Sequence, residues 1–335
     1  MRRLIAIPVL SFLFLVLGPG LALACGGLVA DEHAEVLRKA TTLAAWYDGY
    51  EHYVTGFQFA GTANSFGYII PLPAAPTKIE KGGDWTLERL ELEVSPQRLL
   101  FGAAATEAAS PVEVLQQVRI DALDIVVVRG GGPDVAAWAE RNGFDLTPDS
   151  PRVLGRYSSA GAIFALARFD RNEATERGLI EGQGTTIHFT IPTPAPWIPL
   201  QILALGKGGS EVVEADLFVL TDHVPSLTPG VWGMPGMSLR SFGRASESLL
   251  DDLRSDRGME WVPREGMWLT ALSLRTPSAE LRHDLSIDGG GPTGRSTSSP
   301  ARSSSELWLS ILVGGAAAVA VLVMWRPAPP PVGHA

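Results

Sequence analysis

An uncharged stretch of 19 residues near the C-terminus, residues 307–325, limits what this chain can fold into. At about 1.5 Å per residue, a helix of that length approaches the roughly 30 Å hydrocarbon core of a bilayer. Trp308 and Trp325 lie near its ends, where aromatic side chains anchor a span at the membrane interface, and the basic Arg326 follows. We therefore expect a transmembrane helix at 307–325, which leaves the preceding residues to form a body in water.

The N-terminus has the pattern of a secretory signal peptide. A basic start precedes an apolar run over residues 4–17, and the small residues Ala22 and Ala24 lead to Cys25. We expect a signal peptide at 1–24 that is cleaved after Ala24. Two interpretations of Cys25 stay open: lipidation of its sulfur, or an unpaired N-terminal thiol. The match to lipidation is incomplete, because Ala22 stands where lipoprotein signals usually have Leu.

The two ends together predict a single-pass protein of the cell membrane. We expect residues 25–287 to form an extracytoplasmic domain and residues 288–306, rich in Gly, Ser and Pro, to form a flexible tether. Residues 326–335 are then a short cytoplasmic tail, in agreement with the positive-inside rule.

The charge and the cysteine count exclude some classes of protein. The chain has 27 basic and 36 acidic side chains, a formal charge of −9. Removing Arg2 and Arg3 with the signal peptide leaves 25 basic side chains and a charge of −11. An acidic body is poorly suited to nucleic acid, so no nucleic-acid partner is expected. Cys25 is the only cysteine, so an intramolecular disulfide cannot form.

Patterns of period two dominate the body and predict strands. We expect a hairpin of strands 52–60 and 66–72, and further strands at 124–129, 162–169, 185–191, 198–205, 211–220 and within 259–275. Helices are predicted at 86–100, at 134–143 and around 152–157. The expected fold class is α+β, a mainly antiparallel β core with a few packed helices, plus the C-terminal transmembrane helix.

No catalytic or ligand-binding motif stands out. The glycine-rich turn at 130–133 lacks the G-x-G-x-x-G and Gly-Lys-Ser/Thr patterns of nucleotide-binding loops, and no G-x-S-x-G or H-E-x-x-H is present. Residues 31–35 (DEHAE) are the densest cluster of metal-type ligands, but neighbours on a strand point to opposite faces, so a solvated acidic turn is favoured. His223 and His283, each beside an aspartate, lack a third ligand in the sequence, and His188 is expected to be a sheet residue. We therefore assign no catalytic residue, no cofactor and no metal site.

Two tryptophans in proline-rich loops are candidates for a binding surface. Trp197 lies in PTPAPWIP and Trp232 in PGVWGMPGM. Exposed aromatic side chains in such loops can contact a glycan or a peptide. Packing in the core is the alternative for both residues.

Several stretches together resemble a bacterial family of uncharacterised exported proteins, the domain of unknown function 2330 (DUF2330). They are ACGG at 24–27, FGYIIPLPAAP at 66–76, WAERNGF at 138–144 and IHFTIPTPAPWIPLQILALG at 187–206, and the resemblance extends from the signal peptide to about residue 225. It implies export and a C-terminal span, but no reaction, cofactor or catalytic residue. Relatives often have further cysteines near the start, and their absence here puts any multi-cysteine site in doubt.

The expected function is that of a membrane-tethered extracytoplasmic domain with a binding or assembly role in the cell envelope, with an envelope protein or glycan as its partner. The alternative is an envelope hydrolase or metal-dependent enzyme whose site combines residues far apart in the sequence.

Overall fold

The computed structural model describes residues 27–30, 39–58, 66–94, 112–176 and 184–292. The strands are β1 (Gly27–Ala30), β2 (Ala40–Tyr47), β3 (Tyr50–Gln58), β4 (Phe66–Leu72), β5 (Lys78–Lys81), β6 (Glu113–Ile120), β7 (Leu123–Arg129), β8 (Ile163–Phe169), β9 (Gly184–Pro192), β10 (Trp197–Ile198), β11 (Val212–Thr221), β12 (Leu227–Thr228), β13 (Met237–Arg244), β14 (Trp268–Pro277) and β15 (Leu285–Ile287). The helices are α1 (Thr86–Val94), α2 (Gly132–Arg141), α3 (Ser150–Ala160), α4 (Arg171–Glu176) and α5 (Glu247–Ser255), with 3₁₀ turns η1 (Gln201–Ala204), η2 (Val231–Gly233) and η3 (Ser278–Glu280).

The strands form three sheets. A five-stranded sheet has the order β1-β4-β8-β7-β6, a seven-stranded sheet has the order β13-β14-β11-β2-β3-β9-β5, and a small sheet has the order β10-β15-β12. Among the described residues, β11 with β2 is the one parallel pair. The expected α+β class with mainly antiparallel sheets is therefore confirmed.

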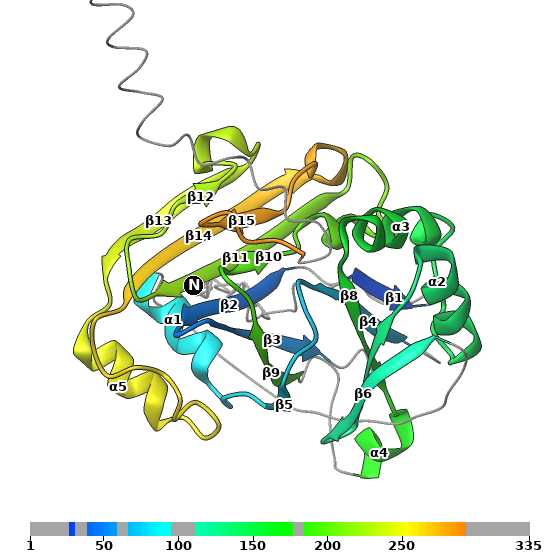
Figure 1. Ribbon diagram of the computed structural model, residues 1–335, viewed down its shortest axis with the longest axis horizontal. Helices are drawn as coiled ribbons and strands as arrows, with labels where there is room; N and C mark the ends of the chain where they lie inside the picture. Colours follow the sequence, from blue (N-terminus) through cyan, green and yellow to red (C-terminus); the bar gives the residue numbers. More distant parts are fainter. Residues whose placement is uncertain (1–26, 31–38, 59–65, 95–111, 177–183, 293–335) are drawn as a thin grey trace, which may run out of the picture. The chain divides into compact units, whose positions relative to one another are not determined.

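Three apolar cores define the layers of the domain (Figure 1). The five-stranded and seven-stranded sheets bury one face against each other, for example through Ile125, Phe189 and Leu272. The outer face of the five-stranded sheet is covered by α2 and α3, and that of the seven-stranded sheet by α1 and α5. Each sheet is thus buried on both faces, which explains uninterrupted apolar runs such as the one in β7.

The segment from β7 into α2 follows the sequence signals closely. Pro133 lies in the first turn of α2, where its missing N–H is not needed, and Gly143 follows the helix with φ +79°. Gly132 is also required by packing, since a Cβ there would lie 2.1 Å from the backbone N of Gly155 on α3. The predicted strand, turn and helix are confirmed.

The predicted hairpin of strands 52–60 and 66–72 is wrong. Both strands exist, but β3 pairs with β2 and β9 in the seven-stranded sheet, whereas β4 pairs with β1 and β8 in the five-stranded sheet. The predicted strand at 198–205 is also wrong, because β10 ends at Ile198 and the chain then forms η1.

Residues after 226 complete the seven-stranded sheet and its helical cover. Strand β14 pairs with β11 on one side and β13 on the other, and α5 supplies Leu249, Leu250 and Leu253 to the core beneath it. The carboxylate of Asp256, which follows α5, caps α1 by accepting hydrogen bonds from Asp84 N (2.9 Å), Trp85 N (2.9 Å) and Thr86 Oγ1 (2.8 Å).

The predicted transmembrane helix at 307–325, the signal peptide and most of the tether lie outside the described residues. Within the described ranges, no helix combines the length and apolar character needed to cross a bilayer. The first residues of the predicted tether are described: Asp288 N donates to Ser226 O (2.7 Å) and Gly290 N to Ile287 O (2.8 Å).

Candidate functional site

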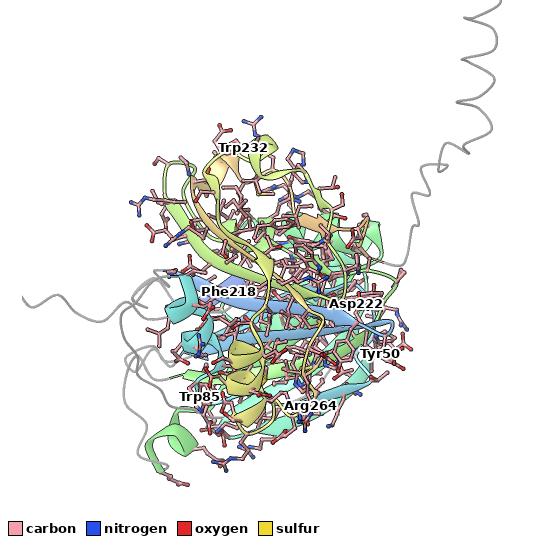
Figure 2. All side chains as sticks on the ribbon, turned by 90° about the vertical axis from the view of Figure 1, so that its left-hand side faces the viewer. Tyr50, Trp85, Phe218, Asp222, Trp232 and Arg264 are labelled. Atoms are coloured by element: carbon pink, nitrogen blue, oxygen red, sulfur yellow. The ribbon has the colours of Figure 1, made fainter. Side chains whose placement is uncertain are left out.

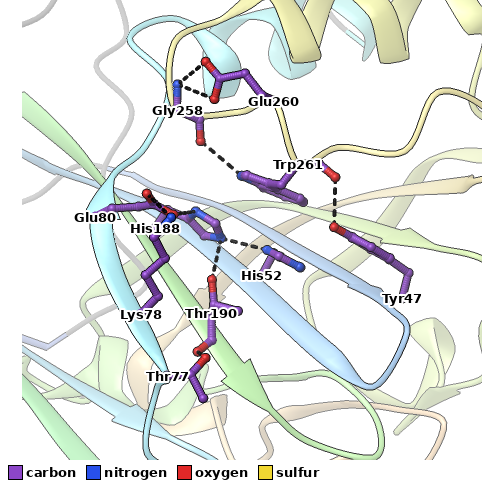
Figure 3. Close-up of polar contacts among 10 residues, drawn as sticks. All are labelled: Tyr47, His52, Thr77, Lys78, Glu80, His188, Thr190, Gly258, Glu260 and Trp261. Atoms are coloured by element: carbon purple, nitrogen blue, oxygen red, sulfur yellow. Dashed lines mark hydrogen bonds and ion pairs between the residues drawn. The ribbon is translucent and has the colours of Figure 1, made fainter.

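Two buried histidines meet on the outer face of the seven-stranded sheet (Figure 3). His52 on β3 and His188 on β9 lie 136 positions apart in the sequence, and His52 Nδ1 is 2.9 Å from His188 Nε2. Their exposed fractions are 7% and 1%. The hydroxyl of Thr190 lies 3.4 Å from the same His188 Nε2.

An indole covers this histidine pair. The Trp261 ring lies 4.1 Å from the ring of His52 and 4.7 Å from that of His188, with interplanar angles of 8° and 26°. The Tyr47 ring lies 5.0 Å from that of His52 and 6.4 Å from that of Trp261, and its hydroxyl donates to Trp261 O (2.8 Å). Trp261 Nε1 donates to Gly258 O (3.1 Å), so the indole is held from two directions (Figure 3).

Charged groups on β5 lie beside the pair. Glu80 Oε1 is 3.4 Å from His188 Nδ1 without hydrogen-bond geometry, and the other oxygen of Glu80 pairs with Lys78 Nζ at 2.7 Å. Because a carboxylate only accepts, it favours the tautomer in which His188 Nδ1 carries the proton. His188 Nε2 then accepts from His52 Nδ1–H.

Burial keeps both rings neutral at pH 7. Desolvation, reinforced by the charge of Lys78, lowers the pKa of His52 to about 4. Desolvation, followed by the effects of His52 and Lys78, lowers the pKa of His188 to about 3. The pair can therefore accept and donate hydrogen bonds as neutral imidazoles at pH 7, and the Trp261 ring stacks on both of them.

Local structure explains why these side chains converge. The β2–β3 turn places Asp48 and Gly49 at positive φ, which brings Tyr47 and His52 to the same end of the sheet. His52 and His188 then meet diagonally, since His52 is opposite Thr190 in the β3–β9 ladder. Trp261 lies on the segment between α5 and β14.

A second polar group is buried on the other face of β3. Glu51 is fully buried; its Oε1 accepts from Trp197 N (3.1 Å) and its Oε2 has no hydrogen-bond partner among the described residues. Desolvation raises the pKa of Glu51 to about 8. Glu51 is thus a neutral acid over most of the physiological pH range.

The structure separates the two predicted surface tryptophans. Trp197 is 4% exposed, packs against Tyr157 and belongs to the core beneath α2 and α3, so its expected place on a binding surface is corrected. Trp232 is 95% exposed and projects from η2 (Figure 2). Proline-rich context alone does not distinguish these two environments.

The isolated histidines have different surroundings. His223 Nδ1 contacts Asp222 Oδ1 and its Nε2 contacts Asp288 Oδ2 at 2.9 Å, and the bond to Asp222, with that to Asp288, raises the pKa of His223. His188 is a sheet residue, as expected. Among the described residues, no group of three or more His, Cys, Asp or Glu side chains could hold a metal ion.

Other predicted positions cannot be placed. The cleavage site Ala24 and Cys25, the cluster at 31–35 and the membrane-interface anchors Trp308, Trp325 and Arg326 lie outside the described residues.

The histidine pair has no signature in the local sequence. Each histidine interrupts an otherwise apolar or Thr-rich strand, which is a weak signal, and nothing local links positions 52 and 188.

Comparisons with known proteins give one family and no curated relative. A family model described as an uncharacterized protein conserved in bacteria, DUF2330, matches residues 19–226. No curated protein matches the chain. Trp261 and β14 lie beyond the matched residues.

Two solved structures show a weak likeness. A crystal structure of baculovirus P35 has a TM-score of 0.40 at 10% identity and covers 75% of this chain and 96% of that chain. A mutated baculovirus P35 after caspase cleavage has a TM-score of 0.41 at 8% identity and covers 73% and 98%.

Proposed function

The chain belongs to the bacterial family of uncharacterised proteins DUF2330, and on that premise we propose that it is a membrane-tethered extracytoplasmic domain that binds another component of the cell envelope. The placement is supported by the signal-peptide pattern of residues 1–24 and by the uncharged run at 307–325. It is tested by fractionation and by adding protease to spheroplasts. The full-length chain should sediment with membranes and its body should be digested; a soluble, protected chain would contradict the placement.

The observation that supports a binding role is the exposure of Trp232. Trp232 is 95% exposed, so it gains none of the free energy that burial of an apolar side chain provides. Exposed tryptophans are frequent anchors of protein interfaces. Figure 2 shows Trp232 projecting away from the rest of the domain.

The loop that presents Trp232 is held on both sides. Gly233 N donates to Gly230 O (2.8 Å) and Met237 N to Met234 O (3.1 Å), while Met234 and Met237 are buried. A side chain on a fixed loop loses little conformational entropy when it binds.

Gly236 fixes the base of this loop. It has φ +73°, and a Cβ there would lie 2.1 Å from Arg275 O on β14. Arg275 N donates to Gly236 O at 2.9 Å. The loop is therefore attached directly to β14, the strand next to the β13 edge of the seven-stranded sheet.

The test is photo-crosslinking in intact cells. A photoreactive amino acid at position 232 should give one specific adduct with an envelope component, whereas the same group at the exposed Tyr50 should not. Trp232→Ala should reduce co-purification of that component. Identical adducts from both positions, or none from position 232, would contradict a binding role at Trp232.

The alternative, an envelope hydrolase or metal-dependent enzyme, is favoured by one observation. His52, His188 and Glu80 form a chain of polar contacts between distant parts of the sequence, as such a site requires. Zinc chloride should raise the melting temperature if the enzyme is metal-dependent, and a chelator should reverse the shift. No group of three or more His, Cys, Asp or Glu side chains among the described residues could hold the ion, so the histidine pair itself supports only the hydrolase form of this alternative. Without a zinc response, the binding role is favoured.

A further inference from the structure

The edge strand β13 has an apolar surface on one face. Leu239 is 46% exposed and Phe242 is 48% exposed, and they lie opposite Leu272 and Thr270 of β14. Since these partners are two positions apart on β14, Leu239 and Phe242 point to the same face of the sheet. Further inside, and at Met237, this face is part of the core between the sheets, but at Leu239 and Phe242 it stays open.

Trp268 and Arg244 extend this surface. Arg244 lies opposite Trp268 in the same ladder, and its guanidinium carbon is 5.5 Å from the centre of the indole. The Phe242 and Trp268 rings are 5.7 Å apart. We call these four residues, Leu239, Phe242, Arg244 and Trp268, the β13 patch.

The charge of β13 differs from that of the body. The strand contains Arg240 and Arg244 and no acidic residue, within a body of net negative charge. Among the described residues, no carboxylate pairs with Arg244. A complementary partner is therefore anionic and also carries apolar groups for Phe242 and Leu239.

The backbone of β13 favours an extended partner. β13 is the last strand of its sheet and pairs with β14 alone among the described strands. A bulge between Leu239 and Ser241 divides the ladder with β14 into residues 237–239 and 241–244, and the longer regular part contains Phe242 and Arg244. A second copy of β13 would bring arginines together, which disfavours self-pairing.

We propose that the β13 patch binds an extended, acidic segment of a partner protein, whose backbone adds to the edge of β13 and whose carboxylates pair with Arg244. This inference names the partner for the proposed binding role. The proposed binding role is tested at Trp232 in cells, whereas the acidic partner of the β13 patch is tested at Arg244 with purified components. Failure of one test is therefore distinguishable from failure of the other.

The probe is a fluorescent peptide of eight alternating Glu and Val residues, titrated into the purified full-length chain. It should bind more tightly than a Lys/Val peptide, and the affinity should fall when the salt is raised from about 0.05 M to about 0.5 M. Arg244→Glu should weaken binding about tenfold, while Arg152→Glu on α3, which is also exposed, should not. Arg244→Lys should keep most of the affinity, and a thermal unfolding curve of Arg244→Glu that matches that of the unchanged chain shows that its loss of affinity is not a loss of folding.

Two further measurements can overturn the proposal. A peptide of the same sequence that is N-methylated at every position cannot donate to β13, so equal binding would exclude strand addition. Equal binding of dextran sulfate, with the same dependence on Arg244, would mean a polyanion site instead. Absence of binding by the Glu/Val peptide would also overturn the proposal.

Discussion

At the scale of single residues, the fold buries one acid and two bases in their neutral forms. Glu51 keeps its proton, and His52 and His188 are not protonated, at pH 7. Glu51 is protonated in the folded state up to a pKa of about 8, well above its ordinary value of 4.5. The folded state then binds the proton more tightly than the unfolded state, so this residue lowers stability as pH rises from about 4.5 to about 8.

Glu51→Gln removes that dependence. The amide resembles the neutral acid, so the free energy of unfolding should change little near pH 4.5 and rise by roughly 2–4 kcal/mol near pH 9. Denaturant unfolding at both pH values measures this. A variant that is destabilised equally at both would show that the carboxylate is ionised in the fold.

His52 and His188 have the reverse effect. Their folded pKa values of about 4 and about 3 lie below the ordinary 6.5, so protons bind preferentially to the unfolded chain and stability falls as pH drops below about 6.5. His188→Gln should reduce the loss between pH 7 and pH 5 by about 2 kcal/mol. His283→Gln, at an exposed position, is the matched control. If His188→Gln leaves the pH dependence of the free energy of unfolding unchanged, His188 is not buried as a neutral ring.

At the scale of elements, Asp256 joins α5 to the start of α1. Asp256→Asn should lower the free energy of unfolding by roughly 1–3 kcal/mol, because the amide cannot accept the three hydrogen bonds equally well. Asp252→Asn, which removes a surface pair with Arg89, should cost less than about 1 kcal/mol. Urea unfolding measures both variants. Equal losses of unfolding free energy would show that the Asp256 cap stabilises the fold no more than a surface ion pair does.

Local sequence predicts many elements but not their pairing. The apolar run of β7 and the proline and glycine around α2 define strand and helix by themselves, and these predictions are confirmed. Strands β3 and β4 also have clear patterns, yet the sheet that each joins depends on distant partners such as β9 and β8. β13 and α5 were not predicted, because their exposed polar residues dilute the apolar pattern.

The candidate site shows the same limit. Trp232 and Trp197 have similar proline-rich neighbours, but Trp197 is buried because β10 pairs with β15, nearly 90 residues later. The histidine pair depends on the β3–β9 ladder and on the segment that supplies Trp261. Tertiary structure therefore decides which tryptophan is exposed and which histidines are in contact.

At the scale of the whole molecule, the residues matched by the family model do not include all the strands of the seven-stranded sheet. A chain that stops at residue 226 lacks β14 and α5, so Phe218 and Leu220 lose their cover. We expect residues 25–226 to show no cooperative unfolding transition, whereas residues 25–292 should show one. Thermal unfolding by circular dichroism tests this, and a folded short form would contradict the role assigned to β14.

The position of β15 has a mechanical consequence. This strand is the last before residue 292 and is bonded through only two residues to each of β10 and β12, beside the contacts of Asp288 with Ser226 and His223. A force applied to the chain beyond residue 292 therefore acts first on these contacts. Leu285 and Ile287 would be extracted from the core while the ladder of β14 still resists the load.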